Sequence, residues 1–328
     1  METPKTINVL ALSGGGYRGL FTAQVLDQLE KSTGKKITDH FDLITGTSIG
    51  GIIALGLASG ISPSEIVNVF RERGAEIFPS PEKKLKYALW AFKRALTTSL
   101  YEARGLKNVL EDLFGDKKLK ELDKAYVMVT AARASTGKPK FFKTPHDESF
   151  YTDLDIPVVD AALATSAAPV YFPMHYIEHD STRYLDGGLV GNAPGLFGYI
   201  EAITRLGDKN SDVRVLSVGA LSGKPCVSEN TSPAPRLRYW LNHTNPRLLE
   251  LTFAIQEHQT NNMLNLLLGD NYSIIDPTVS EEASSDIGLD NTSKAAQTAL
   301  LSRANEEASN FTNTNFYKAF LKGKEQKS

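Results

Sequence analysis

Apolar runs alternate with amphipathic stretches through about the first two thirds of the chain, which predicts strands that each lead into a helix. Residues 7–12 form a nearly continuous apolar run, as expected for a strand that is covered on both faces. Leucine, valine and alanine then recur at helical spacing over 20–31. Further strands are predicted at 41–45, 126–132, 140–143, 183–186 and 213–220, and further helices at 49–58, from Ser62 onward, and at 106–114, 157–168 and 192–206.

This order predicts an α/β fold, a three-layer α/β/α sandwich with a mostly parallel central sheet. Beyond residue 221 the pattern becomes mainly helical, with helices predicted at 248–267, 292–309 and 311–321 and an edge strand at 272–275. No shift in composition marks a domain boundary. We therefore expect a single domain over 1–328, in which 7–220 is the α/β core and 221–328 is a helical layer packed on that core.

Composition indicates the cellular compartment and limits the classes of binding partner. A formal net charge of −2 gives no overall attraction to a nucleic acid polymer. Cys226 is the single cysteine, so no intrachain disulfide can form, and a reducing compartment is favoured. Residues 1–6 lack the long apolar segment of a signal peptide, and the stretch 49–61 is too short to span a bilayer. We therefore expect a cytoplasmic protein.

The chemistry of the chain centres on the turn between the predicted strand 41–45 and the predicted helix 49–58. This turn reads Gly46-Thr47-Ser48-Ile49-Gly50, a G-x-S-x-G motif. A strand that turns sharply into a helix leaves little room beside the turn, so the positions two before and two after the serine must be glycine. Ser48 would then project its hydroxyl from the sheet edge, over the start of the helix, as a nucleophile does. The alternative is a glycine-rich turn that carries a surface serine.

A second glycine-rich turn follows the first predicted strand and leaves backbone N–H groups free at a helix start, which makes an anion cradle. Gly14-x-Gly16-x-x-Gly19 matches the dinucleotide-binding fingerprint, so a nucleotide-binding protein with a phosphate cradle is one interpretation. That fingerprint also needs an acidic residue at the end of the second strand, whereas Asp42 begins its strand. The other interpretation is an oxyanion hole formed by the amides of Gly15 and Gly16, and the nearby serine turn favours it.

One carboxylate stands on a third tight turn, Asp186-Gly187-Gly188. A short predicted strand ends on Asp186, and the two glycines let the backbone turn at once. We therefore expect this carboxylate at the same sheet edge as Ser48. The alternative is an aspartate that stabilises its own turn.

A serine nucleophile needs a base, and histidine is the commonest one. His243 and His258 follow Asp186, so the Ser-Asp-His order of the α/β-hydrolases is formally available. Neither lies at a glycine-marked strand end, and a histidine on a helix is more often a surface or core residue. The histidines considered are His40, His146, His175, His179, His243 and His258. No cluster has the spacing of a calcium loop or a zinc site, so no metal cofactor is expected.

The segment 79–101 differs from its surroundings because lysines and arginines share it with apolar residues that fall on one helical face. A basic amphipathic helix with flanking aromatic residues is typical of a segment that contacts a membrane surface, here the inner membrane face. A surface helix that packs its apolar face on the core fits the same pattern, and both interpretations stay open.

Three motifs together resemble the signatures of the patatin-like phospholipases: GGGYRG from Gly14, GTSIG from Gly46 and DGG from Asp186. The segments 164–173 and 192–194 also resemble that family, and the likeness covers about 7–220, two thirds of the chain. The strand at 216–220 is a looser match, and the resemblance does not extend to the C-terminal helices.

The resemblance implies a lipid acyl hydrolase with a Ser48–Asp186 dyad, no histidine in the mechanism and a catalytic core over 7–220. Membrane phospholipid would be the substrate, and the oxyanion hole would comprise Gly14, Gly15, Gly16 and Arg18, with Gly46, Gly50, Gly187 and Gly188 shaping the turns. Short bacterial members are similar to antiphage effectors that cyclic oligonucleotides switch on, which implies a cyclic nucleotide activator. The oligomeric state is not indicated.

Overall fold

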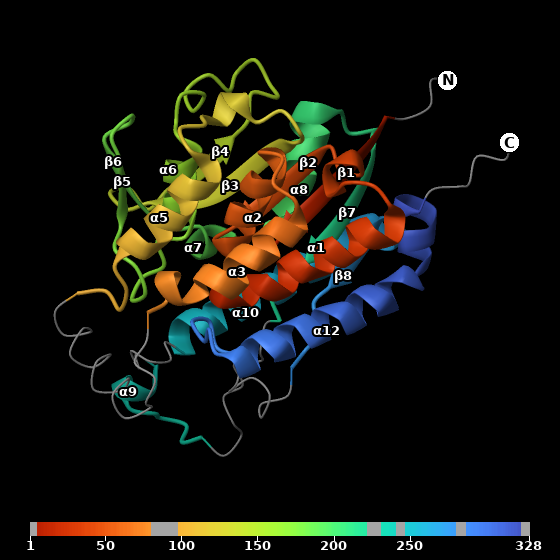
Figure 1. Ribbon diagram of the computed structural model, residues 1–328. Helices are drawn as coiled ribbons and strands as arrows, with labels where there is room; N and C mark the ends of the chain where they lie inside the picture. The colour runs from red at the N-terminus through yellow and green to blue at the C-terminus, as the bar shows by residue number, and fades with distance from the viewer. Residues whose placement is uncertain (1–4, 80–97, 222–230, 241–246, 280–286, 323–328) are drawn as a thin grey trace, which may run out of the picture.

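The computed structural model describes residues 5–79, 98–221, 231–240, 247–279 and 287–322 (Figure 1). Within these residues one eight-stranded sheet runs through the molecule in the order β5-β6-β3-β2-β1-β7-β8, with β4 paired to β3. The strands are β1 (Thr6–Leu12), β2 (Leu43–Thr47), β3 (Tyr126–Arg133), β4 (Pro139–Lys143), β5 (His175–Ile177), β6 (Thr182–Asp186), β7 (Asp212–Val218) and β8 (Tyr272–Ile275).

The central part of the sheet is parallel, as the sequence predicted. Strands β3, β2, β1, β7 and β8 pair in parallel, whereas β4, β6 and β5 join by antiparallel pairing. Strand β6 therefore runs against its neighbour β3, with Asp186 opposite Ala131. Because Thr47 lies opposite Thr130, the end of β6 and the end of β2 reach the same edge of the sheet.

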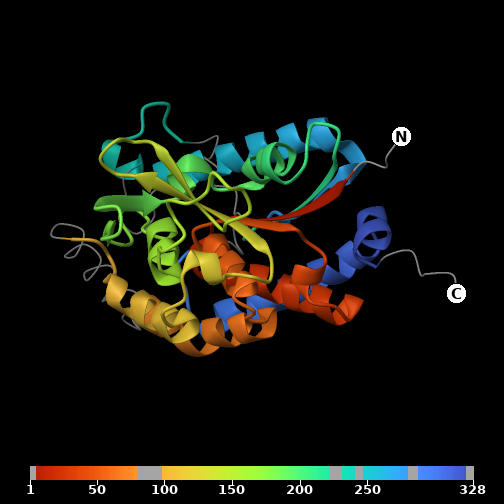
Figure 2. The ribbon, with the colours of Figure 1, turned by 90° about the horizontal axis from the view of Figure 1, so that it is seen from above.

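Helices cover both faces of this sheet. Figure 2 shows α10 and α8 on one face and α1, α3, α5 and α12 on the other. The main helices are α1 (Gly19–Thr33), α2 (Ile49–Ala58), α3 (Pro63–Ile77), α5 (Ala103–Phe114), α6 (Val158–Thr165), α7 (Gly188–Gly191), α8 (Gly195–Glu201), α9 (Leu237–Trp240), α10 (Arg247–Leu268) and α12 (Lys294–Thr312), and a π-helical turn (Ala202–Leu206) continues α8.

Strand β1 explains why two layers of helices are needed. Ile7, Val9 and Ala11 are buried in the core on the α8 and α10 side, whereas Leu10 and Leu12 are buried in the larger core on the α1 side. A strand with apolar side chains on both faces must be covered on both faces. This burial is the physical basis of the apolar run from which the first strand was predicted.

The element predictions differ from the structure mainly at short elements. The predicted helix 192–206 begins later, at Gly195 after Pro194, and consists of α8 followed by a π-helical turn, while the short helix α7 lies before it and was not predicted. Strand β5 was not predicted, and it is three residues long. The predicted basic amphipathic helix at 79–101 lies almost wholly outside the described residues, and the division into a core and a C-terminal layer stays a prediction.

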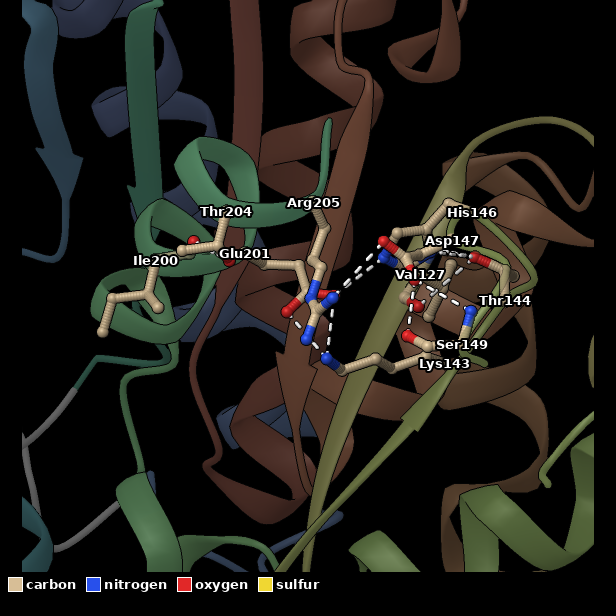
Figure 3. A network of polar contacts seen from close by, with 10 residues as sticks. All are labelled: Val127, Lys143, Thr144, His146, Asp147, Ser149, Ile200, Glu201, Thr204 and Arg205. Atoms are coloured by element: carbon tan, nitrogen blue, oxygen red, sulfur yellow. Dashed lines mark hydrogen bonds and ion pairs between the residues drawn. The ribbon is translucent and has the colours of Figure 1, made fainter. Parts of the chain in front are cut away.

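A polar network around the buried carboxylate of Glu201 ties β4 to α8 on the α8 face of the sheet (Figure 3). Lys143 Nζ lies 2.7 Å from Glu201 Oε2, and His146 Nε2 lies 2.9 Å from Glu201 Oε1. Burial would raise the pKa of the Glu201 carboxyl, but the hydrogen bonds from His146 and Lys143 bring it below its ordinary value. The carboxylate is therefore held charged between two donors.

We expect Glu201→Leu to lower the free energy of unfolding by about 3 kcal/mol, because it leaves the largely buried donors of Lys143 and His146 without their carboxylate. Urea denaturation monitored by circular dichroism measures this change. Glu306→Leu is the matched control, since it removes an exposed carboxylate that pairs with Arg303 and should change stability by less than about 0.5 kcal/mol. An equal loss in both variants would contradict a structural role for the network.

Candidate active site

Ser48 occupies the sharp turn between β2 and α2 in a strained backbone conformation. Its φ of 52° and ψ of −124° are rare for a residue with a side chain. A Cβ atom on Gly46 would lie 2.4 Å from the carbonyl oxygen of Gly50, and one on Gly50 would lie 2.2 Å from that of Leu12. Neither position has room for a side chain, which is the physical reason for the glycine spacing.

The Ser48 hydroxyl points at a buried carboxylate. Ser48 Oγ donates a hydrogen bond of 2.8 Å to Asp186 Oδ2, although the two residues are 138 positions apart. The other carboxylate oxygen, Oδ1, accepts 2.6 Å from the amide of Gly188. A Cβ on Gly187 would lie 2.3 Å from the Thr130 carbonyl oxygen, so glycine is required here for β6 to end against β3. The structure thus brings together the serine turn and the aspartate turn.

Burial tunes the acidity of this carboxyl group. Asp186 is 2% exposed. Burial raises the pKa of Asp186 to about 7, and the hydrogen bonds from Gly188 and Ser48 lower it in part. An unperturbed aspartate has a pKa of about 3.9, so this carboxyl takes up a proton far more readily than an exposed one.

The glycine-rich turn lies against the serine. A Cβ on Gly14 would lie 3.3 Å from the Cβ of Ser48. The amide of Gly14 donates to the Asn192 carbonyl oxygen over 3.0 Å, and that of Tyr17 donates to the Leu289 carbonyl oxygen over 2.7 Å. Gly14 was expected among the oxyanion donors, but its N–H is already engaged in this way.

The backbone N–H groups of Gly15 and Gly16, which lie between Gly14 and Tyr17, are available to a ligand. Among the described residues, the N–H groups of Gly15 and Gly16 have no acceptor, and both residues line the pocket that contains Ser48. Arg18 orders this turn, because its Nε donates to the Gly15 carbonyl oxygen at 3.4 Å and its Nη1 to that of Leu221 at 3.1 Å. Two adjacent free donors beside a serine hydroxyl are suited to hold an oxyanion.

The described histidines lie away from this pocket. His146 belongs to the network with Glu201, His175 pairs with Asp160 at 2.8 Å, and His179 lies 3.1 Å from the Thr152 carbonyl oxygen. His40 lies near Thr33, His258 is exposed on α10, and His243 lies outside the described residues. None of the five described histidines lines the pocket. For the described histidines, His258 among them, the geometry gives the Ser-Asp-His interpretation no support.

Two residues of the site were given no role by sequence reasoning. Thr165 Oγ1 accepts the amide of Ser48 over 2.9 Å and so helps to hold the strained turn. Asn192 is buried beside Gly14 and lines the pocket. The segments around both residues carry the family resemblance, so the signal was present, but a motif alone does not say which backbone group a side chain reaches.

Comparison with protein-family models matches residues 10–195 to the patatin-like phospholipase model. The chain belongs to the patatin-like phospholipase family. It is 43% identical to a cGAMP-activated phospholipase of Pseudomonas aeruginosa, with 92% of this chain and 88% of that protein covered. A cGAMP-activated phospholipase of Escherichia coli is 37% identical over the same shares, 92% and 88%. A cUMP-AMP-activated phospholipase of Escherichia coli is 26% identical, covering 80% of this chain and 78% of that protein.

Among solved structures, human GIVD cytosolic phospholipase A2 in complex with methyl gamma-linolenyl fluorophosphonate aligns at a TM-score of 0.47 and 14% identity, covering 97% of this chain and 59% of that one. The match to the family model confirms the patatin-like family and the acyl hydrolase class predicted from the sequence, and the strand pairing confirms the mostly parallel α/β fold. Among the described helices, none combines the length and the apolar character needed to cross a membrane.

We expect Asp186→Asn to stabilise the folded protein above pH 7. The raised pKa means that the native state holds this proton more tightly than the unfolded chain does. The stability that wild-type Asp186 contributes is therefore greatest below about pH 4 and is lost as the pH rises through about 7. The variant does not titrate, so its advantage over wild type should grow between pH 4 and pH 8, up to about 4 kcal/mol.

Thermal unfolding at a series of pH values measures this difference. Asp116→Asn, at an exposed position, is the control and should shift the melting temperature little. A difference between Asp186→Asn and wild type that stays constant from pH 4 to pH 8 would contradict the raised pKa.

Proposed function

We propose that this protein is a phospholipase A-type enzyme that hydrolyses fatty-acyl esters of membrane phospholipids and is activated by a cyclic dinucleotide in antiphage signalling. One observation carries the catalytic part of the proposal. The Ser48 hydroxyl donates to the buried carboxylate of Asp186, and it does so beside the unengaged amides of Gly15 and Gly16. Nucleophile, base and oxyanion donors are the three parts that acyl transfer requires.

In the first half of the reaction, Ser48 Oγ attacks the ester carbonyl carbon while its proton passes to Asp186 Oδ2. The amides of Gly15 and Gly16 hold the oxyanion that forms. As the tetrahedral intermediate collapses, the bond from the carbonyl carbon to the alcohol oxygen breaks. Asp186 returns its proton to that oxygen, and the lysophospholipid leaves. The acyl group remains bound to Ser48 as an ester.

In the second half, a water oxygen attacks the acyl carbon and gives a proton to Asp186. The bond from the carbon to Ser48 Oγ then breaks, and Asp186 passes the proton to that oxygen as the fatty acid leaves. An ordinary aspartate is a weak base for an alcohol at neutral pH. Burial raises the pKa of Asp186 to about 7, which matches the base to neutral conditions without a histidine.

The pocket around Ser48 has a wall suited to an acyl chain. Ile49 and Ile52 of α2, Phe70 of α3 and Leu106 of α5 line it. A second, almost wholly apolar pocket between α2, α3 and α5 shares these same four residues and continues past Gly56. Apolar walls that continue from the nucleophile into a second pocket support binding of a fatty-acyl chain.

The relatives support activation by a cyclic dinucleotide. Two proteins that align with 92% of this chain are named cGAMP-activated phospholipases, and a more distant one is named a cUMP-AMP-activated phospholipase. Cytoplasmic location and membrane contact through 79–101 stay predictions, and 80–97 lies outside the described residues.

The alternative of a nucleotide-binding protein that uses the glycine-rich turn as a phosphate cradle has less support. The turn faces Ser48, and the Asp186 carboxylate lies at the same pocket. A phosphate held there would meet a group that bears negative charge whenever it is deprotonated. A neutral ester whose charge develops during attack fits this site better.

Ser48→Ala and Asp186→Asn should each lower phospholipid hydrolysis by at least about 10³-fold, because each removes a group that every step uses. Release of fatty acid and lysophospholipid from mixed phospholipid vesicles measures this activity, with and without cGAMP. His258→Ala is the matched control and should retain wild-type activity. Wild-type activity in Asp186→Asn would refute the dyad, and equal activity with and without cGAMP or cUMP-AMP would refute the activation.

Gly56→Leu should narrow the preference of the enzyme to shorter acyl chains. A Cβ on Gly56 would lie 3.2 Å from the terminal Cδ1 methyl of Ile66, so a larger side chain at position 56 fills the second pocket. We expect kcat/KM to fall about tenfold for a long-chain ester and to change little for a short-chain ester. Gly56→Ala is the control. Equal losses for both chain lengths would show that the second pocket does not hold the acyl chain.

A further inference from the structure

We infer that Glu257 of α10 is a positioning residue for hydrolysis, which acts through Asn192 to hold the glycine-rich turn in the geometry that the oxyanion needs. This inference rests on the proposed function. It begins from a buried carboxyl group that the mechanism does not use. Glu257 is 4% exposed and lines the same pocket as Ser48, yet it comes from a helix beyond the residues that match the family model.

Asn192 brackets Gly14 on two sides. Its backbone carbonyl oxygen accepts the Gly14 amide over 3.0 Å, and its side-chain Nδ2 donates to the Gly14 carbonyl oxygen over 3.3 Å. The Gly14 carbonyl belongs to the peptide group whose N–H is that of Gly15. Because a peptide group is planar, a bond that fixes this carbonyl also fixes the direction of the Gly15 N–H.

Helix α10 in turn holds Asn192. The side-chain Nδ2 of Asn192 donates to Glu257 Oε1 over 2.5 Å, and the backbone N–H of Asn192 donates to Gln256 Oε1 over 3.3 Å. The bond to Glu257 is the shorter of the two that Nδ2 makes, so the carboxyl oxygen sets the rotamer of the Asn192 side chain. Asn192 itself is 6% exposed, so water has little access to its side-chain amide and cannot readily replace Glu257 as the hydrogen-bond acceptor.

The placement of this carboxyl group argues for a role in positioning rather than in packing. Burial of a carboxyl group opposes folding, and an apolar residue of similar length would fill the same space at less cost. Helix α10 already has apolar anchors, since Leu264 is fully buried and Phe253 lies against Gly188. What the carboxyl group adds is a strong acceptor for the side chain that donates to the Gly14 carbonyl oxygen.

Steady-state kinetics of Glu257→Met and Glu257→Gln test this inference. Assays use a water-soluble short-chain ester with cGAMP present, so that binding to vesicles does not affect the measured kcat and KM. Glutamine keeps an acceptor oxygen for Asn192 and should stay within about threefold of wild type. Methionine has similar length without an acceptor, so kcat should fall about 100-fold, the usual effect of a lost oxyanion donor, while KM changes less than twofold.

Controls separate this inference from the proposed function and from misfolding. His258→Met, at the next and exposed position of α10, should behave as wild type, and Ser48→Ala should be inactive. Wild-type kcat in Glu257→Met with an inactive Ser48→Ala would overturn the positioning role and leave the function intact. An active Ser48→Ala would overturn the function itself.

Two further outcomes are decisive. Equal losses of kcat in Glu257→Gln and Glu257→Met would overturn positioning by a hydrogen bond. Should Glu257→Met fail to fold, Glu257→Asp replaces it, because the shorter side chain withdraws the carboxyl group from Asn192. A reduced kcat at an unchanged melting temperature supports the inference, and a wild-type kcat overturns it.

Discussion

The active site depends on holding one buried carboxyl group against one serine hydroxyl. Removal of Asp186 from water destabilises its charged form, and the hydrogen bonds from Ser48 and Gly188 compensate for part of that loss. Those bonds require the ends of β2 and β6 to meet at one level of the sheet, although β6 runs antiparallel to its neighbour β3. Glycine at 187 follows from this convergence, because a side chain there would overlap Thr130. Glycine is thus required in this turn because the backbones of neighbouring strands approach each other closely beside Asp186.

Much of the fold and part of the site could be predicted from the sequence, because the deciding signals are local. The apolar run of β1 reflects burial on both of its faces, and the glycines around Ser48 reflect a turn without room for Cβ atoms. Glycine spacing identifies close approach without naming what approaches. The meeting of Ser48 and Asp186 across 138 residues was therefore inferred from a shared sheet edge and a family resemblance, and the coordinates supply its geometry.

Other features could not be predicted, because they arise between elements that are distant in the sequence. Strand β5 is too short to produce an alternating pattern. Thr165 reaches the Ser48 amide from a different helix, and no periodicity reports such a contact. The partners of the neighbouring loop amides are a further case. The amides of Gly15 and Gly16 were expected as oxyanion donors from the sequence, but the bonds from the Gly14 and Tyr17 amides to Asn192 and Leu289 were not. These bonds depend on packing against the later part of the chain.

This division of the amides shows what the residues beyond 195 contribute to a site whose motifs all lie before them. Leu289 engages the Tyr17 amide from one side, and Glu257 orders Asn192 at Gly14 on the other, so Gly15 and Gly16 are held between two contacts from the C-terminal part of the chain. A movement of α10 would loosen one of these contacts and redirect the Gly15 amide. A ligand could drive such a movement only as far as its affinity differed between the two arrangements. An activator that favours the engaged position of α10 would therefore raise kcat without contacting the serine or the aspartate.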